Sequence, residues 1–275
     1  MALLKDFRYH TPSTLYEALG ILMKAQEPLL LGGGTFVLNH LKKSPKYPTD
    51  VIGLKKIPSL RGIKESGEGL SIGAMMTIAE LVESELIQKN FSSLFQASRH
   101  LGTTPIRHMA TIGGNIASRF FWVDLPAVLI SLGAKVCLST FNSEETMTVE
   151  EFLNKKPAKK FVLTAILFPK KDLVAHYFRH TKTMDVDVPS LAFAFCASLE
   201  KKRLSNVKLI VNTTVSLPVE LKVTEALFEG KDLKRIVFSA AKGAIKNDMG
   251  KAKLDEYRMH CLEVDLENLI NLLKR

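Results

Sequence analysis

The sequence predicts a two-domain α/β protein. Between residues 7 and 169, short apolar strands alternate with amphipathic helices, and capping-box residues mark the start of three of these helices. From about residue 174 the pattern changes to long strands at 187–199 and 207–215, and helices follow them. We therefore place a boundary near Lys170-Lys171-Asp172, between a first domain of mixed strands and helices and a second domain of α+β type.

The first element of the chain is a predicted strand at 7–9. Thr14 and Glu17 then form a capping box before a helix whose apolar residues fall on one face. Apolar strands at 29–31 and 50–54 follow this helix. Together they predict a small unit of βαβ type.

The rest of the first domain follows the same alternation. A polar turn at 66–69 leads into the next strand, and capping boxes recur at Thr77 with Glu80 and at Thr148 with Glu151. Proline after Asp124 indicates a helix start with Asp124 as its N-cap. The elements predicted here are strands at 70–73, 135–138 and 162–168 and helices at 78–82, 91–101 and 125–132.

Two glycine-rich segments, Gly32-Gly33-Gly34-Thr35 and Thr111-Ile112-Gly113-Gly114-Asn115, are predicted as turns, each after an apolar stretch. Glycine lacks the Cβ atom that keeps backbone N–H groups away from a ligand, and it permits positive φ, so such turns can bind anions. Two of them can hold one diphosphate between them. For either segment alone, an ordinary strand-to-helix turn is the commoner explanation.

Other catalytic and nucleotide-binding motifs are incomplete or lie in the wrong structural context. The first glycine segment does not complete G-x-G-x-x-G, and neither Gly-Lys pair precedes the Ser or Thr of a P-loop. Residues 69–73 match G-x-S-x-G, but the alternation around Ser71 places it in mid-strand. His176 and His180 lack the glutamate of a zinc-protease helix and lie in a predicted strand. The sequence therefore predicts no catalytic side chain and no metal site.

Composition limits the class of protein further. The net charge is +10, but the lysines are scattered in short groups, which favours a solvated surface over a nucleic-acid stripe. The three cysteines form no C-x-x-C pair, which argues against a disulfide framework or an iron–sulfur cluster in this chain. No apolar run reaches the roughly 18 residues of a membrane span. Because the N-terminus also lacks a signal peptide, we expect a cytoplasmic location.

The chain resembles the FAD-binding (medium) subunit of the molybdenum hydroxylases, the family of xanthine dehydrogenase and carbon monoxide dehydrogenase. The resemblance covers nearly the whole chain, and its most specific part runs from Pro105 to Ala117. The other matching segments are Phe7-x-Tyr9-x-x-Pro12-x-Thr14-x-x-Glu17-Ala18, Gly32 to Thr35, Ile72-Gly73-Ala74, Asp124-Leu125-Pro126, Leu132-Gly133-Ala134 and, more loosely, Lys182-x-x-Asp185 and Tyr257-Arg258.

This resemblance implies a fold and a site. The fold is the vanillyl-alcohol-oxidase (PCMH) type of FAD-binding fold, with lobes at about 1–58 and 59–172 and an α+β domain at 173–275. FAD carries the redox chemistry itself, so no catalytic side chain is needed. The implied cofactor-binding residues are Leu31, Gly32, Gly33, Gly34, Thr35, Phe36, Thr111, Gly113, Gly114, Asn115, Asp124 and Lys182.

The resemblance also implies an oxidoreductase subunit without a membrane span or a nucleic-acid partner. An iron–sulfur subunit would pass it electrons from a molybdenum-cofactor subunit, and FAD would deliver them to NAD⁺ or another acceptor. Phe36 and the bulky 120–123 stretch depart from the family pattern and leave open a structural or regulatory subunit without flavin. The net charge leaves open a nucleic-acid-binding module.

Overall fold

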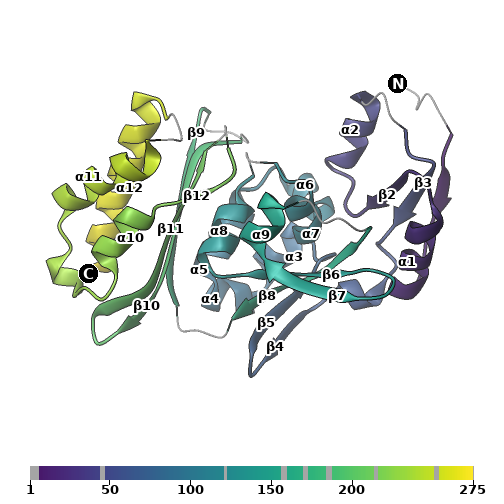
Figure 1. The fold of residues 1–275 in the computed structure, drawn as a ribbon, viewed down its shortest axis with the longest axis horizontal. Coiled ribbons are helices and arrows are strands. Elements are labelled where there is room, and N and C mark those ends of the chain that lie inside the picture. The colour runs from purple at the N-terminus through teal and green to yellow at the C-terminus, as the bar shows by residue number, and fades with distance from the viewer. Residues whose placement is uncertain are drawn as a thin grey trace. The chain divides into compact units, whose positions relative to one another are not determined.

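The computed structural model describes most of the chain and divides it into two compact units. The first unit holds residues up to 81, 103–119 and 134–169, and the second holds 82–102, 120–133 and 170 onward. Figure 1 shows the elements of both. The residues described are 6–43, 47–120, 123–155, 160–169, 173–183, 188–213, 216–250 and 254–274.

The first unit begins with a parallel three-stranded sheet. Strands β1 (Arg8–His10) and β2 (Pro28–Leu31) both pair with β3 (Asp50–Gly53), so the order is β1-β3-β2. Helix α1 (Leu15–Lys24) connects β1 to β2, and α2 (Val37–Lys43) lies between β2 and β3. This arrangement confirms the predicted unit of βαβ type.

Helix α1 is fixed at its start and along one face. The Thr14 hydroxyl accepts the Glu17 N–H, as predicted, but the Glu17 carboxylate accepts the N–H of Ser13 instead of that of Thr14. Residues of the inner face, Ala18, Leu19 and Leu22, are buried and pack in one cluster with Ile52 of β3.

A buried carboxylate joins the strands β1 and β3 at their start. Asp50 accepts two hydrogen bonds from the Arg8 guanidinium, at 2.9 and 3.0 Å, and lies 2.8 Å from Nε2 of His10. The hydrogen bonds from Arg8 hold the pKa of Asp50 well below its usual range. Folding therefore gains from an ionised Asp50 at neutral pH and loses this contribution as the pH falls toward the acidic pKa of the folded state.

A five-stranded antiparallel sheet completes the strands of the first unit. The order is β4-β5-β8-β6-β7, and Ser71 lies in the middle of its strand, as predicted. The strands are β4 (Ile63–Ser66), β5 (Gly69–Gly73), β6 (Lys135–Ser139), β7 (Glu144–Thr148) and β8 (Val162–Pro169). The helices are η1 (Pro58–Leu60), α3 (Ile78–Glu83, which continues into the second unit), α6 (Thr104–Met109), α7 (Ile112–Ala117) and α9 (Val149–Asn154).

The second unit is built on an antiparallel sheet of order β12-β11-β10-β9. Its strands are β9 (Leu173–Thr181), β10 (Pro189–Glu200), β11 (Arg203–Thr213) and β12 (Val219–Glu220). Its helices are α4 (Glu85–Asn90), α5 (Ser92–His100), α8 (Leu125–Ser131), α10 (Lys222–Phe228), η2 (Leu233–Arg235), α11 (Phe238–Met249) and α12 (Glu256–Leu273). The long strands and the following helices confirm the predicted pattern.

Strand β10 is buried on both faces. Because side chains alternate along a strand, Phe193 and Phe195 share one face, and both belong to the core that includes residues of α10, α11 and α12. The opposite face carries Ala192, Ala194 and Cys196, which are also buried. Helices α5 and α8 pack against strands of this sheet, and Figure 1 shows them on the face away from α10–α12.

The compact units differ from the predicted division into 1–172 and 173–275. Residues 82–102 and 120–133 were assigned by sequence to the first domain, yet they belong to the second unit. The cause is packing, since α5 contacts β9 and α8 contacts β10 and β11. The predicted boundary at Lys170-Lys171-Asp172 lies outside the described residues, and the two-domain assignment stays a proposal.

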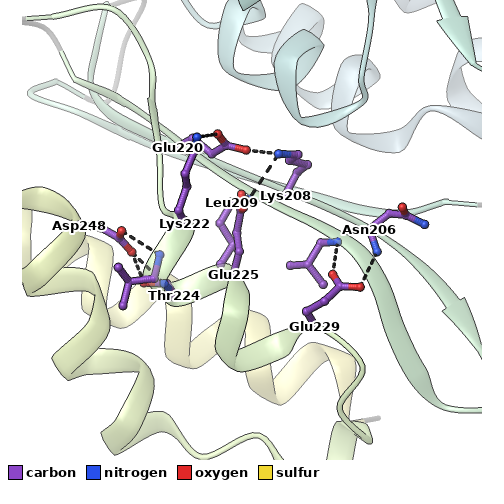
Figure 2. A network of polar contacts seen from close by, with 11 residues as sticks. Asn206, Lys208, Leu209, Glu220, Lys222, Thr224, Glu225, Glu229 and Asp248 are labelled. Atoms are coloured by element: carbon purple, nitrogen blue, oxygen red, sulfur yellow. Dashed lines mark hydrogen bonds and ion pairs between the residues drawn. The ribbon is translucent and has the colours of Figure 1, made fainter.

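Carboxylates from α10 attach this helix to the neighbouring strand (Figure 2). Glu229 accepts the N–H groups of Asn206 and Val207, at 3.1 and 2.9 Å. One turn earlier, Glu225 accepts the N–H of Leu209 at 2.8 Å. These bonds satisfy backbone donors of β11, so α10 is fixed to the strand by polar contacts as well as by apolar packing.

Glu225 makes the stability of the second unit depend on pH. Partial burial, with the charges of Glu220 and Asp248 in support, raises the pKa of Glu225 from 4.5 to about 7. Because the pKa is raised in the folded state, the free energy of unfolding falls as the pH rises from about 4.5 to 7 and stays lower above it. We expect Glu225→Gln, which keeps the acceptor, to be more stable than the wild type at pH 8 by about 1 kcal/mol, since solvent screens part of the effect.

Urea unfolding at pH 5 and at pH 8 measures this difference. The stabilisation by Glu225→Gln should be present at pH 8 and small at pH 5. Glu267→Gln, an exposed carboxylate on α12, serves as the control and should change neither value. Equal effects of Glu225→Gln at the two pH values would contradict the assignment.

Candidate functional site

The first glycine segment is a loop with free backbone donors. It connects β2 to α2, and Gly34 has a φ of 75°, a left-handed conformation that favours glycine. Within the described residues, the amides of Gly32, Gly33, Gly34 and Thr35 donate to no acceptor. Consecutive free N–H groups in such a loop form a concave site for an anion.

The second glycine segment is not the predicted turn but the start of helix α7. Thr111 is its N-cap, and the Thr111 hydroxyl accepts the N–H of Gly114 at 3.1 Å. The amides of the two residues between them donate to the carbonyls of Met76 and Ala74, and the amide of Asn115 donates to the Thr111 carbonyl. Four of the five backbone donors of this segment, those of residues 112–115, are therefore already used inside the protein.

The second segment can contact a ligand through side-chain groups. The Thr111 oxygen accepts a hydrogen bond, so its own hydrogen remains available to donate. Four residues further along, on the same face of α7, the Asn115 side-chain oxygen is buried without a hydrogen-bond partner. A buried polar atom without a partner is rare in folded proteins and indicates a group that is missing from the protein alone.

The two segments lie in direct contact within the first unit. A Cβ atom on Gly33 would lie 1.8 Å from the carbonyl oxygen of Met109 and 2.6 Å from its carbon. A Cβ atom on Gly32 would lie 3.2 Å from the Thr111 hydroxyl oxygen. The absence of side chains at Gly32 and Gly33 therefore allows the loop to approach the start of α7, and the two glycine segments lie side by side.

Exposed apolar side chains occur next to both segments. Phe36 and Leu38 follow the first segment and are 37% and 43% exposed, and Met109 precedes the second and is 50% exposed. Helix α6, which ends at Met109, has no buried residue. Apolar groups beside an anion site are what a ligand with both a phosphate and a planar ring requires.

Asp124 does not have its predicted capping role. Its backbone is helical and its side chain makes no cap bond. Instead the carboxylate accepts from the Tyr177 hydroxyl and, at 2.8 Å, from Nε of Arg179. Burial raises the pKa of Asp124, and the charge of Arg179 opposes this shift. The two partners were missed by sequence, although period-two alternation in β9 places them on one face.

Asp124 and Lys182 belong to the second unit, and Lys182 is exposed just after β9. The structure brings the other ten predicted site residues together in the first unit, so a contact of these two with the cofactor stays a prediction. Asp185, Phe121 and Trp122 lie outside the described residues.

The remaining candidates for chemistry carry structural roles. His176 and His180 lie in strand β9, as predicted, and burial lowers the pKa of His176. All three cysteines are free thiols. In the described part of the chain, no three His, Cys, Asp or Glu side chains are grouped closely enough to hold a metal ion. Among the described helices, none has the length and apolar character that a membrane crossing requires.

Comparison with known sequences gives one family. A family model described as the FAD binding domain in molybdopterin dehydrogenase matches residues 5–171. The carbon monoxide dehydrogenase medium chain of Hydrogenophaga pseudoflava is 33% identical over 147 residues, 53% of this chain and 51% of that protein. The nicotinate dehydrogenase FAD-subunit of Eubacterium barkeri is 28% identical over 57% of this chain and 54% of its own length. The matches thus span about half the length of these two relatives.

Longer matches have lower identity. The xanthine dehydrogenase FAD-binding subunit of Escherichia coli O157:H7 is 22% identical over 96% of this chain and 94% of that protein. Among solved structures, reconstituted carbon monoxide dehydrogenase from Oligotropha carboxidovorans has a TM-score of 0.85 at 22% identity and covers 96% of both chains. The Hydrogenophaga pseudoflava enzyme that lacks the Mo-pyranopterin moiety has a TM-score of 0.80 at 25% identity, over 87% of this chain and 86% of that one. These structures confirm the predicted α/β fold.

Proposed function

Because the chain belongs to the family of FAD-binding domains in molybdopterin dehydrogenases, we propose that it is the flavin subunit of a molybdenum hydroxylase. In this role it passes electrons from iron–sulfur clusters of a partner subunit through FAD to NAD⁺ or another acceptor. The observation that carries the proposal is the row of free amides from Gly32 to Thr35, beside the start of α7.

The residues of the first unit fit the cofactor. Four backbone N–H groups in one loop match a diphosphate, whose oxygens accept hydrogen bonds from several N–H groups. Side chains at these positions would keep the diphosphate away from the backbone. The Thr111 hydroxyl and the Asn115 side-chain oxygen add one donor and one acceptor. Leu31 and Phe36 flank the loop on its apolar sides. FAD supplies the redox chemistry when bound, and the protein binds and orients it.

Several further assignments belong to this proposal. Asp124 and Lys182 belong to the proposed set of cofactor-binding residues. The partners are an iron–sulfur subunit and a molybdenum-cofactor subunit, and the location is the cytoplasm. The names of the relatives support a multi-subunit enzyme, since they include medium chains and FAD-binding subunits of dehydrogenases.

The visible absorption spectrum of the purified protein tests the proposal. We expect bound flavin at one FAD per chain, or stoichiometric uptake when FAD is added to the flavin-free protein. A chain that neither contains nor takes up FAD would instead be a structural or regulatory subunit. One observation favours this structural or regulatory role: amides of the second glycine segment already donate hydrogen bonds within the protein.

The variant Thr111→Val, compared with a capping control, distinguishes a role of Thr111 in cofactor binding from its role in helix capping. The change keeps the shape of the side chain but removes both the cap acceptor and the donor. We expect a loss of about 1 kcal/mol of stability and FAD binding about tenfold weaker. Thr148→Val is the matched control, because Thr148 caps α9 in the same way. It should reduce stability equally and leave the FAD dissociation constant unchanged, whereas equal FAD affinities of the two variants would contradict a ligand role for Thr111.

A further inference from the structure

Six positively charged side chains gather at the tip of the β10–β11 hairpin in the second unit. Three come from the hairpin and three from the segment around η2. All six are exposed, and within the described residues none forms an ion pair. We call them the hairpin-tip basic patch, and its members are Lys201, Lys202, Arg203, Lys231, Lys234 and Arg235.

Backbone contacts hold the two segments of the patch together. The N–H of Leu233 donates to the carbonyl of Lys202 at 3.1 Å, and the N–H of Leu204 donates to that of Lys231 at 3.2 Å. Arg203 also pairs with Asp232 in an isolated β-bridge. The charges that the sequence distributes over two separate groups thus share one backbone scaffold.

The turn itself is unusual. Lys201 and Lys202, with φ values of 47° and 64°, form a two-residue turn between the paired residues Glu200 and Arg203. Left-handed backbone at both positions favours Asn-Gly, because lysine is strained there. Another residue with positive φ lies four positions after Lys202, at a bulge in β11. This residue is an asparagine, Asn206, with a φ of 53°. Backbone geometry therefore does not explain the two lysines, whereas a role for their charge does.

We propose that the hairpin-tip basic patch docks an acidic surface on another subunit of the dehydrogenase complex. The inference rests on the proposed function, which supplies the partner subunits. A second copy of this chain carries the same net charge of +10 and is repelled. Unpaired cations on a fixed scaffold attract an acidic face and speed its association.

The surroundings of the patch favour a protein over a nucleic acid. Two exposed apolar residues, Leu199 and Val237, lie two positions from its members and are 39% and 58% exposed. Such residues add the apolar contact found in protein interfaces.

The double variant Lys201→Asn with Lys202→Gly tests the proposal, since it removes two charges and gives the turn its preferred residues. We expect a melting temperature about 2–4 °C higher than that of the wild type. We also expect binding to the purified partner subunits to weaken about tenfold at low salt, mainly through a slower association rate. The difference should vanish in high salt, where the charges are screened. The control is Lys55→Asn with Lys56→Asn, which removes an exposed lysine pair from the first unit.

Three results would overturn the inference: unchanged association rates in the hairpin variant, an equal loss in the control variant, or no salt-dependent association of the wild type with any partner subunit. Binding of a short DNA duplex that the hairpin variant loses, with subunit association intact, would make the patch a nucleic-acid surface and would also overturn it. The flavin content of every protein is measured in parallel. A chain without flavin that still docks through the patch would refute the proposed cofactor while leaving this inference standing.

Discussion

A Gly33→Ala variant is expected to lose its FAD and much of the stability of the first unit. The new methyl group would lie 1.8 Å from the carbonyl oxygen of Met109 and 2.6 Å from the carbonyl carbon. Both are backbone atoms, so no side-chain rotation relieves the clash, and the loop must move away from α7. We expect a cost of about 3 kcal/mol in the free energy of unfolding, at the upper end of the range for overpacked sites.

Flavin absorbance per chain and urea unfolding measure the two effects. Gly67→Ala is the matched control, because Gly67 also lies in a turn of the first unit and its added Cβ would meet no atom within 4 Å. Gly114→Ala should have an intermediate effect, since its Cβ would lie 2.9 Å from the Thr111 hydroxyl, which a side-chain rotation can move. A Gly33→Ala protein with full flavin content and unchanged stability would contradict the convergence of the two segments.

An Asp124→Ala variant is expected to be less stable by about 3–5 kcal/mol, the cost of breaking a buried ion pair. Asp124 is buried, Tyr177 is half-buried, and the Arg179 side chain is only 13% exposed. Removal of the carboxylate leaves a mostly buried guanidinium without its anion and a partly buried hydroxyl without its acceptor. The helix α8 and the strand β9 lose the polar contact that joins them.

A double-mutant cycle identifies the ion pair as the cause. Arg179→Met combined with Asp124→Ala should be less destabilised than the sum of the two single variants, because each single change leaves an unpaired charge and the double change does not. Asp255→Ala is the control for an exposed pair and should cost about 1 kcal/mol through its N-cap role on α12. Strictly additive effects of the Asp124 and Arg179 changes would show that the two groups act independently.

Local patterns in the sequence predicted most of the elements correctly. The capping box of Thr148 and Glu151 forms in full, and Gly133 closes α8 with a φ of 69°. These features depend on residues within one or two turns of each other, so spacing is enough to find them. The same holds for the long strands of the second unit, whose apolar residues alternate or run continuously.

Two of the errors involve partners that are distant in sequence. Glycines at 113 and 114 suggested a turn, but the carbonyls of Ala74 and Met76 fix the segment as the first turn of α7. Asp124 had the position of a helix cap, but strand β9 supplies its partners. The spacing of residues within a short stretch of sequence does not reveal such contacts. The family resemblance indicates which residues belong to the site, but it does not indicate the hydrogen bonds that hold them.

The chain passes back and forth between its two compact units, and this limits where the protein can be cut into fragments for separate expression. The polypeptide changes unit after residues 81, 102, 119, 133 and 169. A single truncation near residue 170 would therefore leave α5 and α8 attached to the N-terminal fragment, with their apolar surfaces exposed, and would deprive the sheet of the C-terminal fragment of its cover. Neither fragment is then a sound choice for separate expression, and the protein is best produced, labelled and studied at full length.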